Sequence, residues 1–164
     1  MQLMMLFWMF ATQGHSQACP QDLTLTGALT FANTESALAR GDIASTFQLY
    51  RMRNLWIRLE TETELDTVEV ESLVFISPNG SRFYETSRLY SRDADLTIVD
   101  GPNMHHPRDS YPAIELESGN VALDLFIPIR GTVFQRYPQL GEWTVEATIQ
   151  GRRGTVVGHF DLVR

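Results

Sequence analysis

The side chains best suited to binding a metal lie together in one short segment. Met104, His105 and His106 are consecutive, and Asp109 follows three residues later. Imidazole with a thioether suits copper, and imidazole with a carboxylate suits zinc. This spacing matches no known ligand motif, and an exposed polar loop with uninvolved histidines explains the same residues. We therefore treat a metal-handling loop as an alternative and predict no bound cofactor.

A second candidate site is a row of aromatic and arginine side chains. Tyr84, Arg88 and Tyr90 stand at even-numbered positions of one expected strand, so they are predicted to share one of its faces. An exposed face of this composition suits a carbohydrate or a protein partner. A sheet face covered by the loop at 100–112 would instead use the rings for packing. The residues leave both interpretations open.

Nothing in the sequence predicts catalysis. There is no Gly-x-Ser-x-Gly motif, the histidines have no recognisable partner, and the only cysteine is Cys19. All 13 basic residues are arginines, which excludes a Schiff-base lysine and a phosphate-loop lysine. The net charge of −7 and the pI near 5.0 give no electrostatic basis for binding nucleic acid. We expect a protein that is not an enzyme.

The first residues resemble a signal peptide. Leu3 to Ala11 form an unbroken apolar run that is too short to span a bilayer. Ser16 and Ala18 then supply small side chains with the spacing that signal peptidase needs. No basic residue precedes the run, which is unusual for such a segment. We expect residues 1–18 to be a signal peptide and the mature chain to be periplasmic, secreted or lipid-anchored.

Cys19 would be the first residue of the mature chain. In one interpretation it is acylated after cleavage, as in a bacterial lipoprotein, and holds the chain at a membrane. The preceding residues match a lipobox only in part, since Ser16 stands where leucine is expected. In the other interpretation Cys19 is a leftover thiol of an ordinary secreted protein. Membrane attachment is predicted only if Cys19 carries lipid.

The remainder of the chain has the composition and pattern of one all-β domain, residues 19–164. Apolar residues make up 43% and charged residues 20%, an ordinary globular balance. Apolar and polar residues alternate in eight or nine short segments separated by turn signals. The clearest segments are Leu55–Glu60, Val68–Ile76, Arg82–Tyr90, Gly141–Ile149 and Thr155–Val163. One short helix is expected within Asn33–Gly41, and this pattern predicts an antiparallel sandwich.

The last quarter of the chain resembles the end of immunoglobulin-like extracytoplasmic modules. In those modules an apolar strand meets a Tyr-Pro-x-Leu-Gly-x-Trp corner, and a Gly turn and a Phe-x-Leu strand follow. The matching residues here are Tyr137, Pro138, Leu140, Gly141, Trp143, Gly151, Phe160 and Leu162. The resemblance implies a fold and no activity, because such sandwiches host many functions. From the alternation within Gly141–Ile149 we expect Trp143 to be buried between the sheets, with Leu125, Val145, Phe160 and Leu162 around it.

Together these features predict an exported, non-enzymatic module that binds or scaffolds a protein or another component of the cell envelope. Two alternatives stay open. The first is a periplasmic metal-handling protein that uses Met104, His105 and His106. The second is a carbohydrate-binding domain that uses Tyr84 or Tyr90.

Overall fold

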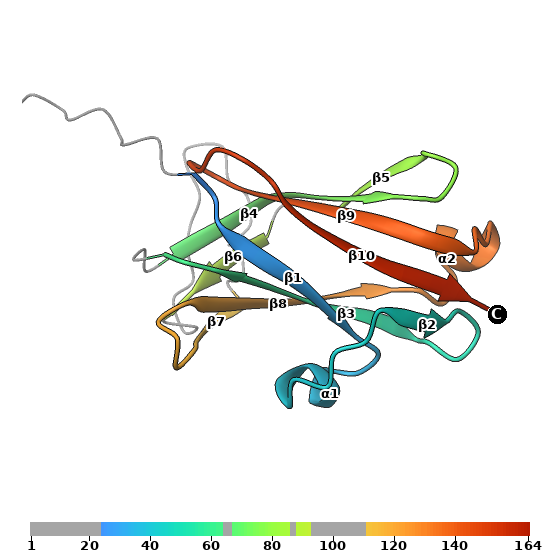
Figure 1. Cartoon of the computed structure of the whole chain (residues 1–164), viewed down its shortest axis with the longest axis horizontal. Coiled ribbons are helices and arrows are strands. Elements are labelled where there is room, and N and C mark those ends of the chain that lie inside the picture. Colours follow the sequence, from blue (N-terminus) through green and yellow to red (C-terminus); the bar gives the residue numbers. More distant parts are fainter. Residues whose placement is uncertain (1–23, 64–66, 86–87, 93–110) are drawn as a thin grey trace, which may run out of the picture.

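A computed structural model describes residues 24–63, 67–85, 88–92 and 111–164 (Figure 1). These residues form ten strands and two short helices. In chain order the elements are β1 (Gly27–Ala32), α1 (Glu35–Ala39), β2 (Thr46–Gln48), β3 (Asn54–Thr61), β4 (Thr67–Ile76), β5 (Arg82–Glu85), β6 (Arg88–Ser91), β7 (Tyr111–Glu115), β8 (Val121–Pro128), α2 (Val133–Arg136), β9 (Gly141–Ile149) and β10 (Val156–Val163). Neither helix of the described part is long and apolar enough to cross a membrane.

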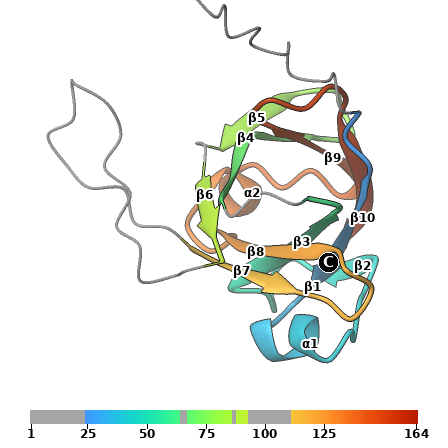
Figure 2. The same cartoon turned by 90° about the vertical axis from the view of Figure 1, so that its left-hand side faces the viewer.

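The strands form one strongly curled sheet. Its strand order is β1-β3-β8-β7-β6-β4-β9-β10-β2, and β5 pairs with β4 beside this path. Viewed along the strands, the sheet bends round so that β1 lies beside β10, while α1 packs on the outside (Figure 2). The all-β prediction is confirmed. The sheet of the described residues has ten strands, whereas eight or nine were expected.

The prediction of a purely antiparallel arrangement is wrong, because two strand pairs are parallel. β2 runs parallel to β10, and β6 runs parallel to β7. Tight hairpins join only antiparallel neighbours, whereas parallel pairs need long connections. The partner of β2 is β10, the last strand of the chain, and residues 92–110 separate β6 from β7. Alternation within one strand carries no information about the direction of such a distant partner.

The core is built from the alternating positions that the sequence pattern identified. In β3 every second residue is buried, as in Leu55, Ile57 and Leu59, and β9 repeats this with Trp143 and Val145. Trp143 is 1% exposed, and its indole Nε1 donates a hydrogen bond to the Gln139 carbonyl at 2.9 Å. The predicted burial of Trp143 is therefore confirmed, as is that of Phe160 and Leu162.

Several predicted boundaries need correction. The expected strand Arg82–Tyr90 is two strands, β5 and β6, which pair with opposite halves of β4. Pro112, expected in a loop, lies within β7. The predicted helix at Asn33–Gly41 is confirmed as α1. Neither β2 nor α2 was predicted.

The curled sheet closes along a seam between β1, its first strand, and β10, the strand that precedes β2 at the other end of the strand order. The starts of β1 and β10 are joined by one parallel bridge, in which the Leu25 amide donates to the Arg153 carbonyl at 2.6 Å. Beyond that point β1 pairs with β3 and β10 pairs with β9. Side-chain packing then closes the seam: Leu29 and Phe31 of β1 sit directly over Gly158 of β10.

Candidate functional site

The residues predicted to bind metal or lipid lie outside the described part of the chain. Met104, His105, His106 and Asp109 fall within 93–110, and Cys19 falls within 1–23. Among the residues that the structure describes, no group of three or more histidine, cysteine or acidic side chains is placed to hold a metal ion.

Tyr84 and Tyr90 do not share a face. Tyr84, on β5, is 68% exposed, whereas Tyr90, on β6, is completely buried. Because β5 ends at Glu85 and β6 begins at Arg88, the period-two alternation does not continue from one strand into the other. The structure therefore separates the expected binding row into an isolated exposed ring and the pair Arg88 and Tyr90.

Arg88 lies at the centre of a group of aromatic residues drawn from four strands. Its guanidinium carbon is 5.5 Å from the ring centre of Tyr111 and 5.9 Å from that of Phe126, both within cation–π range. Arg88 also donates a hydrogen bond to the Phe126 carbonyl at 3.3 Å. The Trp56 ring lies 5.1 Å from Phe126, and the Tyr90 ring lies 5.7 Å from Tyr111. We call these five residues the aromatic–arginine cluster.

Tyr90 anchors the cluster to the sheet from the inside. Its hydroxyl donates a hydrogen bond to the Asp124 carbonyl at 3.1 Å, which satisfies a phenol that no solvent reaches. Burial raises the pKa of the Tyr90 phenol well above its ordinary value. Tyr90 thus fixes the position of Tyr111 and does not itself face a ligand.

An ion pair continues the cluster along the outer face of β3 and β8. Arg58 donates to both carboxylate oxygens of Asp124, at 2.7 and 2.8 Å. The register places Arg58 opposite Asp124 and Trp56 opposite Phe126. Hydrogen bonding to Asp124 raises the pKa of the Arg58 guanidinium above its ordinary value, although partial burial opposes this. The two cross-strand pairs place a strip of charged and aromatic side chains along neighbouring positions of β3 and β8.

Part of the cluster remains open to a partner. Tyr111 is 42% and Phe126 38% exposed, whereas Trp56 is half-buried against Ala32, Ala37 and Leu38 under α1. Partly exposed rings beside an arginine are an arrangement suited to binding. The sequence contained one usable signal: Trp56 is a large aromatic at an outward position of a clearly alternating strand.

Replacing Tyr90 with phenylalanine should destabilise the fold by about 1 kcal/mol near neutral pH, because the Asp124 carbonyl loses its donor. Above about pH 10 the unfolded wild-type chain releases the Tyr90 proton while the folded chain keeps it. The stability of the wild type therefore falls with rising pH by an amount that the variant does not share. Urea unfolding at about pH 7 and about pH 10.5 should show the difference between the two proteins shrinking. An unchanged difference would mean that the Tyr90 phenol is accessible to solvent in the fold.

These features describe a curled β-sheet with an aromatic and cationic strip on its outer face. Comparison of the chain with protein-family models, with curated proteins and with solved structures gives no match.

Proposed function

We propose that this chain is an exported, non-enzymatic module of immunoglobulin-like fold that binds a protein partner in the cell envelope through the aromatic–arginine cluster. The observation that carries the proposal is an arginine held between two half-exposed rings, Tyr111 and Phe126. Tyrosine, tryptophan and arginine contribute most of the binding energy at protein interfaces. Since Arg88 is already fixed by its ring contacts and its hydrogen bond, a partner would lose little side-chain entropy in engaging it.

The pairing of the strands supports the immunoglobulin-like part of the proposal. One run of neighbours, β1-β3-β8-β7, has the A-B-E-D order of such sandwiches, and β4-β9-β10 has the C-F-G order. The chain also passes from one run to the other near its start, because β1 pairs with β3 and β2 pairs with β10. The buried Trp143 in β9 is consistent with a core between two layers.

The binding proposal predicts a partner whose capture depends on Phe126. Tagged wild-type protein should retain a specific partner from detergent-solubilised envelopes of the native host. Phe126→Ser should reduce that recovery about tenfold or more, since truncating a central aromatic anchor costs on the order of 2 kcal/mol. Val157→Ser is the matched control, because Val157 is an exposed apolar residue of β10 outside the cluster. Equal recovery by all three proteins would refute the assignment of this surface.

Carbohydrate is the second candidate ligand, and one observation favours it. The Trp56–Phe126 pair and the Arg58–Asp124 pair are neighbours on the same outer face, so that ring surface and charged hydrogen-bonding groups adjoin. If a glycan array shows binding by the wild type and loss of binding by Phe126→Ser, the ligand of this surface is a sugar and not a protein. The metal alternative rests on Met104, His105 and His106, and calorimetry with copper and zinc tests it directly.

Export predicts the mass of the chain that accumulates in its native host. Cleavage before Cys19 should give the mass of residues 19–164. The same mass with an added diacylglyceryl group would identify a lipoprotein held at a membrane face. Intact-mass spectrometry distinguishes these forms, and a mass that includes residues 1–18 would overturn the export proposal.

A further inference from the structure

We propose that a groove beside β2 binds an extended, acidic peptide segment of a partner protein, which adds to the sheet as a further strand. The groove has a volume of about 510 Å³ and lies between β2 and the start of α1. Its lining includes Thr34, Thr46, Phe47, Gln48, Arg51 and Met52. The lining residues of the groove include no member of the aromatic–arginine cluster.

The backbone of β2 offers unpaired hydrogen-bonding groups to this groove. The Asp161 amide donates to the Ser45 carbonyl at 2.6 Å, and the Leu49 amide donates to the Val163 carbonyl at 2.9 Å. In a strand, alternate residues direct their backbone groups to opposite sides, so Thr46 and Gln48 face away from β10. The Gln48 carbonyl accepts from the Arg51 and Met52 amides. Within the described residues, this leaves the Thr46 amide, the Thr46 carbonyl and the Gln48 amide without a backbone partner.

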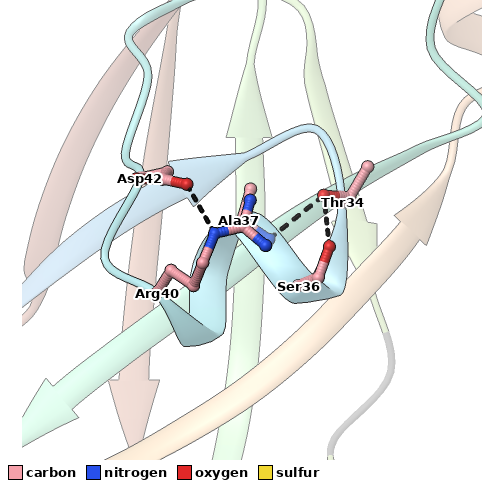
Figure 3. A network of polar contacts seen from close by, with 5 residues as sticks. All are labelled: Thr34, Ser36, Ala37, Arg40 and Asp42. Atoms are coloured by element: carbon pink, nitrogen blue, oxygen red, sulfur yellow. Dashed lines mark hydrogen bonds and ion pairs between the residues drawn. The ribbon is translucent and has the colours of Figure 1, made fainter.

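The groove has an apolar floor and a wall that is already ordered. Phe47 is 3% and Met52 7% exposed, so both belong to the core beneath the groove. The wall begins at Thr34, whose hydroxyl accepts a hydrogen bond from the Ala37 amide at 3.1 Å and so caps α1 (Figure 3). An ion pair of 2.8 Å between Arg40 and Asp42 holds the other end of this short helix (Figure 3). A peptide entering the groove would therefore meet a preformed surface, which lowers the entropic cost of binding.

The charge of the residues that line the groove indicates which kind of peptide it binds. Among the described residues that line the groove, only Arg51 is charged, and it makes no side-chain hydrogen bond or ion pair with the described part of the chain. The chain as a whole carries a net charge of −7. A cation without a counter-charge in the described part of the chain is complementary to a carboxylate, and this local attraction has to exceed the repulsion between an acidic peptide and the net negative chain. Backbone pairing with Thr46 and Gln48 would provide affinity, and contact with Arg51 would provide selectivity for acidic side chains.

A second copy of the chain fits the groove less well than a peptide does. β2 pairs over only three residues, and a short edge of this kind is how proteins limit sheet-to-sheet association. A symmetric pair of β2 strands would also bring the same cation, Arg51, from each copy to one interface. A flexible segment escapes both restrictions, because it needs only a few backbone bonds together with one carboxylate contact.

The test uses a labelled peptide of about ten residues in which valine and glutamate alternate, a length that matches a long strand. Fluorescence anisotropy with the full chain should show saturable binding. The counterpart with lysine in place of glutamate should bind about tenfold more weakly or not at all. N-methylation of alternate backbone amides should have a similar effect, because the peptide then cannot form one side of its ladder.

Two variants locate the site. Thr46→Pro removes an amide that faces away from β10, so the sheet keeps its own ladder while the edge loses a donor. Arg51→Met removes the cation. Each should weaken binding about tenfold, whereas Arg130→Met, which removes an exposed arginine outside the groove, should leave it unchanged. Urea unfolding verifies that each variant is folded.

Three results would overturn the proposal: no saturable binding, equal binding of the acidic and basic peptides, or full affinity in folded Thr46→Pro. A dimer seen by sedimentation that Thr46→Pro abolishes would assign this edge to a second copy instead. Phe126→Ser should bind the peptide normally, so failure here is distinct from failure of the aromatic–arginine cluster as a binding surface.

Discussion

Replacing Trp143 with alanine is expected to lower the free energy of unfolding by about 3–5 kcal/mol, the range for removing a buried large aromatic. The indole is 1% exposed and is surrounded by rings, with centres 4.9 Å away in Phe134, 5.8 Å in Phe83 and 6.3 Å in Phe160. These neighbours come from α2, β5 and β10, so the space left by the indole is bounded by separate elements and cannot close by a small local shift. The Gln139 carbonyl also loses its donor.

Urea unfolding of the wild type and the variant at neutral pH measures this loss. Tyr137→Ala is the matched control: Tyr137 belongs to the same corner of the chain but is 72% exposed. Its substitution should change stability by no more than about 0.5 kcal/mol. Similar midpoints for wild type and Trp143→Ala would mean that β9 presents its other face to the core. That result would reverse the register of the strand on which the fold prediction rests.

The burial of Trp143 was predictable because one strand carries all of the necessary information. Trp143, Val145 and Ala147 alternate with polar residues, and side chains in a strand point alternately to opposite faces. The same reasoning succeeded for β3 and β10. In β4 a register shift between Val70 and Ser72 changes the phase of the alternation, so that Leu73 and Phe75 join the core in its second half. The reasoning failed at 82–90, where two short strands follow one another and the alternation of the first does not fix the face of the second. There Tyr84 proved exposed and Tyr90 buried.

The candidate site was predictable only in part, because its residues meet through strand pairing. Arg88 was identified from its neighbours in sequence, yet the backbone carbonyl that it contacts belongs to a residue 38 positions away. Phe126 reaches Trp56 through the register of β3 and β8, and Tyr111 reaches Tyr90 through a two-residue parallel pair. A single strand's pattern fixes which residues face outward, but not which strand lies beside it. Tyr111 and Phe126 therefore escaped prediction.

Gly158 of β10 is expected to tolerate no side chain without strain. A Cβ atom at this position would lie 2.7 Å from the Leu29 Cβ and 2.9 Å from the Phe31 Cζ. The Leu29 Cβ is fixed to the backbone of β1, and Phe31 is 4% exposed within the core, so neither atom can move away freely. Gly158→Ala should therefore destabilise the fold by about 1–3 kcal/mol through overpacking. The strain would arise at the seam between β1 and β10, where side chains pack together in place of a hydrogen-bonded ladder.

A double-mutant cycle separates this contact from the general effect of altering a strand glycine. Leu29→Gly removes the nearest atom, so adding Gly158→Ala in that background should cost less than adding it to the wild type. Val157→Ala, at an exposed neighbouring position of β10, should change stability by no more than about 0.5 kcal/mol. Identical costs of Gly158→Ala in both backgrounds, measured by urea unfolding, would show that Leu29 does not pack on Gly158. The seam between β1 and β10 would then rest on other contacts, because the Leu29 Cβ is the atom that lies nearest to a side chain added at Gly158.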